Sequence, residues 1–253
     1  MKSKSPQPIA SAQNAKYKTW LSLTTTKGIR AEAQALVSGA KLTAEFARLW
    51  PDKISAVLMT LKMPPPNWLS SCKGAENTFE LSHELFQSLD VLGTHHPLLV
   101  VEAPPLKKWD VHLDPQGLEL VVALGDPNNL GALLRSAEAM GAARVILTEE
   151  AASPYLPRAI RAASGSTFRI PLLRGPALKE VKSGLALDAE GDDISTFQWP
   201  RDARLILGQE GQGLPPTLHA QKLKIPMSGQ VESLNATVAA SLALFTYRQS
   251  LRK

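Results

Sequence analysis

Residues 223–249 read LKIPMSGQVESLNATVAASLALFTYRQ, and they are the most informative stretch of the 253-residue chain. A short strand is expected to end at Pro226 and Met227, because proline fixes φ and has no N–H to donate. After a polar turn, Ser233 is expected to cap a long helix. This helix is rich in Ala, Leu and Val on most sides, so we expect it to be buried. Alone, the stretch predicts only a capped C-terminal helix.

A glycine-rich turn forms the second informative stretch, RLILGQEGQGLP at residues 204–215. An apolar strand leads directly into Gly208, Gly211 and Gly213, with Glu210 between them. Glycines after a strand let a ligand approach the backbone closely. Their order is neither that of a dinucleotide-binding fingerprint nor that of a P-loop. The pattern therefore indicates either a tight turn or a ligand-contacting loop of another kind.

The third stretch, LGDPNNLGALLRSAEAMGAARVIL at residues 124–147, predicts a strand-to-helix turn followed by a helix and a second strand. Asn129 is expected to cap the helix. Arg135 lies inside it, and an arginine there is either exposed or paired with an anion. Taken alone, the stretch is better explained by an ordinary α/β domain with a capping Asn129 and a surface Arg135, because asparagine caps are common.

Together, in order and spacing, these stretches resemble the motifs of the SpoU/TrmH family of SPOUT RNA 2′-O-ribose methyltransferases. The matching positions are Asn129, Arg135, Gly208, Glu210, Gly211, Gly213, Ile225, Pro226, Met227, Ser233, Leu234, Asn235, Val238 and Ala239. The segment RAASGSTFRIPL, with Arg161, Ser164 and Gly165, is similar to a further family stretch. The resemblance covers about residues 118–250.

The resemblance implies an α/β fold in which a parallel sheet flanked by helices ends in a C-terminal trefoil knot. It also implies a homodimer with the active site near the knot and the dimer contact. The cofactor would be S-adenosylmethionine, held mostly by backbone groups. The cofactor-binding positions that it implies are Leu207, Gly208, Gly211, Ile225, Met227, Ser233 and Leu234.

The implied reaction transfers a methyl group to a ribose 2′-hydroxyl of structured RNA and needs no metal, because the cofactor brings its own electrophile. Arg135 would orient a phosphate and favour the alkoxide, since an arginine stays protonated in proteins. The identity of the proton acceptor stays open. The residues expected to form the catalytic site are Arg135, Asn129, Glu210, Ser233 and Asn235.

Four regions are expected along the chain. Residues 1–15 are polar and contain proline, which predicts a disordered basic arm. Residues 16–100 predict a small α/β domain, and VSGAKLTAEFA within them resembles a ribosomal-protein-like RNA-binding element. Residues 101–116 are expected to be a linker, and residues 117–253 the knotted S-adenosylmethionine-dependent domain. Within the second region we expect helices at 28–36 and 79–90 and strands at 54–61 and 97–104.

The formal net charge of +5 favours a polyanionic partner, and RNA is expected. The basic residues that we expect to bind RNA are Lys16, Lys18, Lys27, Arg30 and Arg161. The first residues are either an arm along a phosphate backbone or a solvated tail. Ribosomal RNA is preferred over tRNA by analogy.

The numbers of cysteines and histidines and the lengths of apolar runs indicate the cellular compartment and the absence of a metal site. A single cysteine, Cys72, excludes an internal disulfide and a cysteine-based zinc site. The five histidines show no spacing typical of metal ligands. There is no apolar run long enough to span a membrane and no signal peptide, so a cytoplasmic location is expected.

Four alternatives remain. A dinucleotide-dependent dehydrogenase is disfavoured by the glycine order and by the lack of a suitable acid. A non-catalytic RNA-binding protein of the same fold would be expected to lose Arg135 or Asn235, and both are present. A base methyltransferase would be expected to carry different motifs. A tRNA 2′-O-methyltransferase differs only in its substrate.

Overall fold

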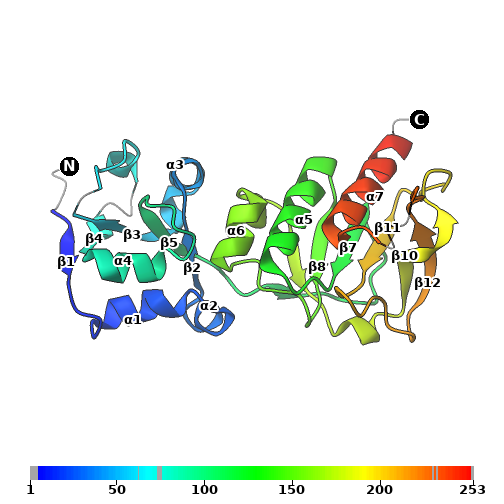
Figure 1. Cartoon of the computed structure of the whole chain (residues 1–253), viewed down its shortest axis with the longest axis horizontal. Helices are drawn as coiled ribbons and strands as arrows, with labels where there is room; N and C mark the ends of the chain where they lie inside the picture. The colour runs from blue at the N-terminus through cyan, green and yellow to red at the C-terminus, as the bar shows by residue number, and fades with distance from the viewer. Residues whose placement is uncertain (1–4, 62, 73–75, 230, 232, 252–253) are drawn as a thin grey trace. The chain divides into compact units, whose positions relative to one another are not determined.

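The computed structural model describes residues 5–61, 63–72, 76–229, 231 and 233–251. They divide into two compact units (Figure 1). The N-terminal unit consists of Met1–Pro105 together with Tyr155–Gly165, and the C-terminal unit of Leu106–Pro154 together with Ser166–Lys253. The segment 155–165, expected to belong to the C-terminal domain, is therefore part of the N-terminal unit.

The N-terminal unit contains a five-stranded mixed sheet with the order β1-β4-β3-β5-β2. The strands are β1 (Gln7–Ile9), β2 (Gln34–Val37), β3 (Ile54–Thr60), β4 (Thr78–Leu81) and β5 (Leu98–Glu102). The helices are α1 (Ala15–Ser22), α2 (Thr26–Glu32), α3 (Ala40–Leu49), α4 (His83–Leu89) and α6 (Pro157–Ala163), with short 3-10 turns at Pro51–Lys53 and Leu69–Ser71. Strand β5 runs antiparallel to β2 and β3, and the other pairs are parallel.

The expected arm at residues 1–15 is ordered over much of its length. Strand β1 pairs with β4, and Ile9 is only 5% exposed because it packs into the core of this unit. The Asn14 side chain caps α1 by accepting from two backbone N–H groups. The prediction of disorder is thus wrong for residues 7–14, while residues 1–4 lie outside the described chain.

Two further expectations for this unit need correction. The helix expected at 28–36 ends at Glu32, because Ala33 adopts a left-handed conformation (φ 50°) and the chain continues as β2. The helix expected at 79–90 is shorter, because residues 78–81 form β4 and Ser82 caps α4. Strands are present where 54–61 and 97–104 predicted them.

The C-terminal unit contains a seven-stranded sheet in which every pair is parallel, with the order β12-β10-β11-β7-β8-β9-β6. Its strands are β6 (Lys107–Lys108), β7 (Leu118–Val122), β8 (Arg144–Leu147), β9 (Leu172–Arg174), β10 (Ser183–Asp193), β11 (Ala203–Leu207) and β12 (His219–Lys224). Its helices are α5 (Pro127–Met140) and α7 (Ala236–Ser250), with 3-10 turns at Ser166–Phe168 and Leu178–Glu180. The prediction of an α/β fold with a parallel C-terminal sheet is confirmed.

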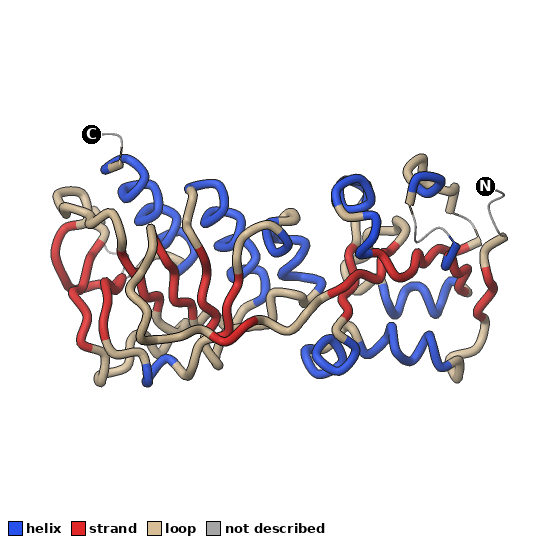
Figure 2. Tube along the Cα trace, turned by 180° about the vertical axis from the view of Figure 1, so that it is seen from behind, coloured by secondary structure: helices blue, strands red, loops and turns tan. Residues whose placement is uncertain are grey.

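Helices α5 and α7 lie side by side against the sheet (Figures 1 and 2). A hydrogen bond of 2.8 Å from Ser241 to Ser136 links them. Helix α7 is not buried on all sides as expected, because Val238, Leu242 and Phe245 are 49%, 41% and 49% exposed. These residues lie at i, i+4 and i+7, so they form one apolar stripe on the outer face of the helix.

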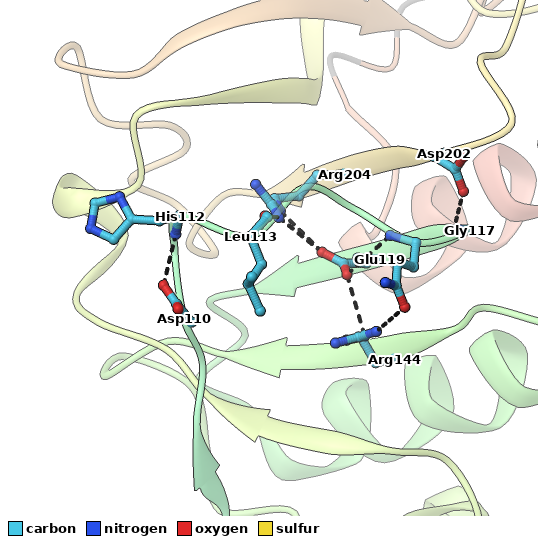
Figure 3. A network of polar contacts seen from close by, with 9 residues as sticks. Asp110, His112, Leu113, Gly117, Glu119, Arg144, Asp202 and Arg204 are labelled. Atoms are coloured by element: carbon cyan, nitrogen blue, oxygen red, sulfur yellow. Dashed lines mark hydrogen bonds and ion pairs between the residues drawn. The ribbon is translucent and has the colours of Figure 1, made fainter.

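Part of the expected linker, residues 101–116, packs against the sheet. Strand β6 pairs with β9, and Trp109 is buried in the core. Figure 3 shows Glu119 of β7 between two arginines of the neighbouring strands, Arg144 at 3.3 Å and Arg204 at 3.1 Å. Arg204 also donates to the Leu113 carbonyl oxygen at 2.8 Å. This charged network therefore fastens the 109–117 segment to the sheet.

Because the strands are parallel, their carboxyl ends lie together on one side of the sheet. Strands β7, β10, β11 and β12 are directed the same way, so the loops that follow them meet at their carboxyl ends. Ligands of open parallel sheets bind at such an edge. None of the helices in the described part of the chain is both long and apolar enough to cross a membrane.

Candidate active site

A cavity of about 610 Å³ lies at the carboxyl ends of β11 and β12, beside residues 187–189 of β10. All seven residues expected to bind a cofactor line it: Leu207, Gly208, Gly211, Ile225, Met227, Ser233 and Leu234. Four of the five expected catalytic residues also line it: Asn129, Glu210, Ser233 and Asn235. Segments far apart in the sequence therefore form one concave site.

The turn at residues 208–213 forms one wall of this cavity and requires glycine. A Cβ on Gly208 would lie 2.6 Å from the carbonyl carbon of Gly213. Gly211 and Gly213 have φ angles of 79° and 70°, which side chains rarely adopt. Two hydrogen bonds between the backbones of Gln209 and Gly213, of 2.9 and 3.0 Å, close the turn. The glycines thus keep backbone groups uncovered at the wall.

Asn129 does not cap α5, as the sequence had suggested, because Asp126 occupies that position. The Asp126 carboxylate accepts from the backbone N–H groups of Asn128 and Asn129 at 2.9 and 2.8 Å. The Asn129 side chain is therefore free to point into the site. Its amide nitrogen donates to Glu210 at 2.5 Å, and its amide oxygen accepts from Asn235 at 3.2 Å.

The cap of α7 is Asn235 and not Ser233. The Asn235 side-chain oxygen accepts from the N–H groups of Thr237 and Val238 at 2.9 and 3.3 Å, and this leaves its amide nitrogen for Asn129. Ser233 is exposed at the cavity wall. The Thr237 hydroxyl donates to the Asn129 carbonyl oxygen at 2.9 Å. One chain of hydrogen bonds thus joins the three stretches that the sequence pattern singled out.

Three lining residues, Leu187, Asp188 and Ala189, were not anticipated. Asp188 forms an ion pair with Lys222 of the edge strand, with 2.9 Å between Oδ2 and Nζ. Burial acts to raise the pKa of the Asp188 carboxyl, but the hydrogen bond and charge of Lys222, together with backbone hydrogen bonds from Glu190 and Ala189, hold the pKa below its ordinary value. The available sequence signal was an acid directly after the apolar strand LAL.

The comparison with protein families decides the relationship. Residues 119–245 match the model of the SpoU rRNA Methylase family. The chain belongs to this family. The family membership predicted from the sequence is confirmed.

The similarity to curated relatives extends beyond residues 119–245 to nearly the whole chain. A Bacillus subtilis protein named 23S rRNA (guanosine(2553)-2′-O)-methyltransferase RlmP is 29% identical, over 95% of this chain and 98% of its own length. A Syntrophobacter fumaroxidans protein named Ribosomal RNA small subunit methyltransferase G 2 is 39% identical over 96% of this chain. The chain spans only 49% of that relative, whose name therefore describes a protein about twice as long.

Solved structures share the fold over nearly the whole chain. The SpoU methyltransferase AviRb from Streptomyces viridochromogenes, in complex with AdoMet, aligns with a TM-score of 0.77 at 24% identity, covering 95% of this chain and 99% of AviRb. An AdoMet-bound rRNA methyltransferase from Sinorhizobium meliloti aligns with a TM-score of 0.76, also at 24% identity, covering 97% and 98% of the two chains. The predicted SPOUT fold class, with a small N-terminal α/β domain, is confirmed.

Arg135 is the one expected catalytic residue of this SpoU protein that does not join the others. It is exposed on α5 and is not among the described residues that line the cavity. Six positions separate it from Asn129, so the two side chains leave the helix on different faces. Within a single chain, Arg135 therefore does not line the cavity formed by that chain.

The five residues expected to bind RNA are Lys16, Lys18, Lys27, Arg30 and Arg161, and all are exposed in the N-terminal unit. Lys16 lies over the ring of Phe79 at 4.3 Å, and Lys18 donates to Gln13 at 2.6 Å. Arg161 lies on α6 against Gly39, where a Cβ would meet its guanidinium at 2.5 Å. Among the described residues there is no cluster of His, Cys, Asp and Glu able to hold a metal ion.

Proposed function

We propose that this SpoU protein transfers a methyl group from S-adenosylmethionine to a ribose 2′-hydroxyl of ribosomal RNA. The observation that carries the proposal is the single cavity in which Asn129, the 208–213 turn and the 225–235 segment meet. Two relatives that align over most of their length are named as 23S rRNA 2′-O-methyltransferases, which supports the substrate class. A ribosomal substrate is consistent with a cytoplasmic location.

The cavity suits an adenosyl cofactor in size and composition. Its volume of about 610 Å³ lies within the range of small-molecule sites. Leu207, Leu223, Ile225 and Leu234 offer apolar surface, and the glycine turn leaves backbone donors and acceptors uncovered. When bound, S-adenosylmethionine supplies a methyl group activated by its sulfonium.

The residues of the chain then have separate tasks. Asn129 holds Glu210 and Asn235 in fixed positions, which sets the distance between the turn and the start of α7. Arg135 presents a fixed positive charge that orients an RNA phosphate and stabilises the developing alkoxide. Such positioning contributes to the rate because the reacting groups are held in line before the reaction.

We infer that the active protein is a homodimer whose contact includes α7. The stripe of Val238, Leu242 and Phe245 is apolar and exposed, and Leu234 beside the cavity is 36% exposed. Contiguous exposed apolar surface of this kind is typical of an interface. A two-fold contact there would explain how Arg135, which is outside its own cavity, completes the cavity of the partner.

Mixed dimers test this arrangement. Arg135→Ala lacks the guanidinium, and Gly208→Val has a blocked cavity. Each variant alone should be inactive, while co-expressed subunits should regain activity, because one site then combines an intact cavity with an intact Arg135. A mixed dimer without activity would contradict the shared site. Phe245→Glu should give a monomer in analytical ultracentrifugation, and an unchanged dimer would contradict the proposed contact.

The N-terminal unit is proposed to hold the RNA through the five basic residues expected from the sequence, all of which are exposed. Each phosphate contact adds to the salt dependence of binding. The double variant Lys27→Ala with Arg30→Ala should bind RNA more weakly and with a shallower salt dependence, while its affinity for S-adenosylmethionine stays unchanged. Equal RNA affinity at all salt concentrations would exclude these two residues from the contact.

Mapping 2′-O-methylation across the ribosomal RNA of cells with and without the gene tests the proposed activity. One ribose methylation should disappear and be restored by the wild-type gene but not by Arg135→Ala. A missing base methylation, or a change confined to tRNA, would overturn the proposed function.

A further inference from the structure

Residues 188–191 of β10 interrupt its otherwise regular pairing with β12, and Asp188 and Ala189 among them line the cavity. Strands β10 and β12 pair up to Leu187 and Leu223, and pairing resumes only at Asp192. Residues 188–191 thus form a bulge in the pairing of the two strands. Asp188, the first of these residues, lines the cavity. Gly191 permits the bulge, because a Cβ at this position would lie 2.4 Å from the Lys222 carbonyl oxygen.

The Asp188 carboxylate is held in place but keeps acceptor capacity. One oxygen accepts from the Glu190 backbone N–H at 3.1 Å, and the other from Lys222 Nζ at 2.9 Å. The Ala189 backbone also forms a hydrogen bond to this carboxylate. An ionised carboxylate offers about four acceptor sites, so about one remains after these three contacts. The side chain is 22% exposed, and Lys222 is not among the described lining residues.

The ionisable residues of the cavity wall indicate what Asp188 can do. Asp188 and Glu210 are the ionisable side chains among the described lining residues, and both are acids. Glu210 accepts from Asn129 within the network that joins the motifs. Asp188 has no bond to that network in the described contacts. It directly follows Leu187, where the regular pairing of β10 with β12 stops. In dinucleotide-binding parallel sheets, an acid near the sites of the phosphates accepts from ribose hydroxyls.

A purely structural role fits these observations less well. A partly exposed ion pair contributes little to stability. Lys222 is 48% exposed and lies on an edge strand, so the pair gains little from burial. Its clear effect is to fix the direction of a carboxylate that lines the cavity.

We propose that the Asp188 carboxylate recognises the adenosyl ribose of the cofactor by accepting a hydrogen bond from its 2′- or 3′-hydroxyl. Lys222 is a positioning residue that acts through Asp188. The inference rests on the proposed function, because it deepens the same site with a group that specifies the cofactor.

Calorimetry with S-adenosylhomocysteine and its 2′-deoxy and 3′-deoxyribose forms tests the proposal without relying on a variant. The wild-type protein should bind the parent compound about 10-fold or more tighter than at least one deoxy form, because a hydrogen bond to a charged group is lost. Asp188→Ala and the isosteric Asp188→Asn should bind the three compounds with much smaller differences.

Three further variants separate recognition of the ribose from a structural role. Asp192→Asn is the matched control, because Asp192 lies on the same strand and is not among the described lining residues. Its carboxylate accepts a hydrogen bond from the Gln221 side chain. It should keep the wild-type preference. Lys222→Met should raise the KM for S-adenosylmethionine and leave kcat unchanged, and Lys222→Arg should restore the KM.

The outcomes distinguish the two levels of the proposal. Wild-type protein that binds the parent and both deoxy forms equally would overturn the role of Asp188 and leave the proposed function standing. Wild-type protein that binds neither S-adenosylmethionine nor S-adenosylhomocysteine would overturn the proposed function itself.

Discussion

Adding one methyl group at Gly208 should weaken cofactor binding without unfolding the protein. A Cβ there would lie 2.6 and 2.7 Å from the carbonyl carbon and oxygen of Gly213 and 3.0 Å from the Leu214 nitrogen. These are backbone atoms, so no side chain can rotate away. The two limbs of the 208–213 turn must separate by several tenths of an ångström.

The size of the effect follows from what the separation breaks. Overpacking costs about 1–3 kcal/mol. The two cross-turn hydrogen bonds between Gln209 and Gly213 each contribute about 0.5–1.5 kcal/mol. Because an open turn relieves part of the strain in the free protein, we expect about 2–3 kcal/mol to appear as lost affinity. That corresponds to a dissociation constant raised about 30- to 150-fold.

Titration calorimetry of Gly208→Ala with S-adenosylhomocysteine measures this loss. Gly125→Ala is the control, because the same methyl group there meets nothing nearer than the Glu150 carbonyl oxygen at 4.0 Å. The control should bind as the wild type does. An affinity of Gly208→Ala within threefold of the wild type would refute the inference that this turn contacts the cofactor.

Three other perturbations probe the supports of the site. Glu119→Gln leaves two arginines without their shared carboxylate and should lower the free energy of unfolding by about 3 kcal/mol in urea titrations; a loss below about 0.5 kcal/mol would show that the network is only a surface contact. Asn235→Asp should keep the cap of α7, and hence stability, but lower kcat at least tenfold because it can no longer donate to Asn129; an unchanged kcat would remove Asn235 from the catalytic site. The hydrogen bond from Arg169 holds the pKa of Glu138 below its ordinary value of 4.5, so the stability that it contributes is present above that value and is lost as the pH falls through the lowered pKa. Glu138→Gln should therefore show a smaller loss of unfolding free energy between neutral and acidic pH than the wild type, and an equal loss would contradict this assignment.

The sequence pattern was sufficient for the sheet and for most of the cavity. Apolar runs such as LELVV at 118–122 and ARLIL at 203–207 predict buried parallel strands because both faces of such a sheet are covered. Three motifs that each had an ordinary explanation became informative once their order was considered. In the structure, all seven residues that were expected to bind the cofactor line the same cavity.

Local capping rules failed where function competes with them. Asn129 and Ser233 both occupy sites where a cap is reasonable, yet Asp126 and Asn235 form the caps. The Asp126 carboxylate releases Asn129 for contacts with residues 81 and 106 positions away along the chain. Sequence-local reasoning has no access to such partners.

Other features were missed because they depend on contacts between residues far apart in the sequence. The segment Gln7–Ile9 is only three residues long and contains a proline, and it becomes a strand because it pairs with β4. Asp188 has no motif around it, and its role depends on Lys222 in a strand that lies beside it only in the folded chain. We expected the outer stripe of α7 to be buried because of its composition, but composition does not tell which face of an apolar helix the rest of the chain covers.

The most direct test of the account is methyl transfer from labelled S-adenosylmethionine to ribosomal RNA, followed by digestion to nucleosides and mass spectrometry. The account predicts label in one 2′-O-methylated nucleoside with the wild-type protein and none with Arg135→Ala, although that variant still binds the cofactor. Label on a base, or undiminished transfer by Arg135→Ala, would contradict it.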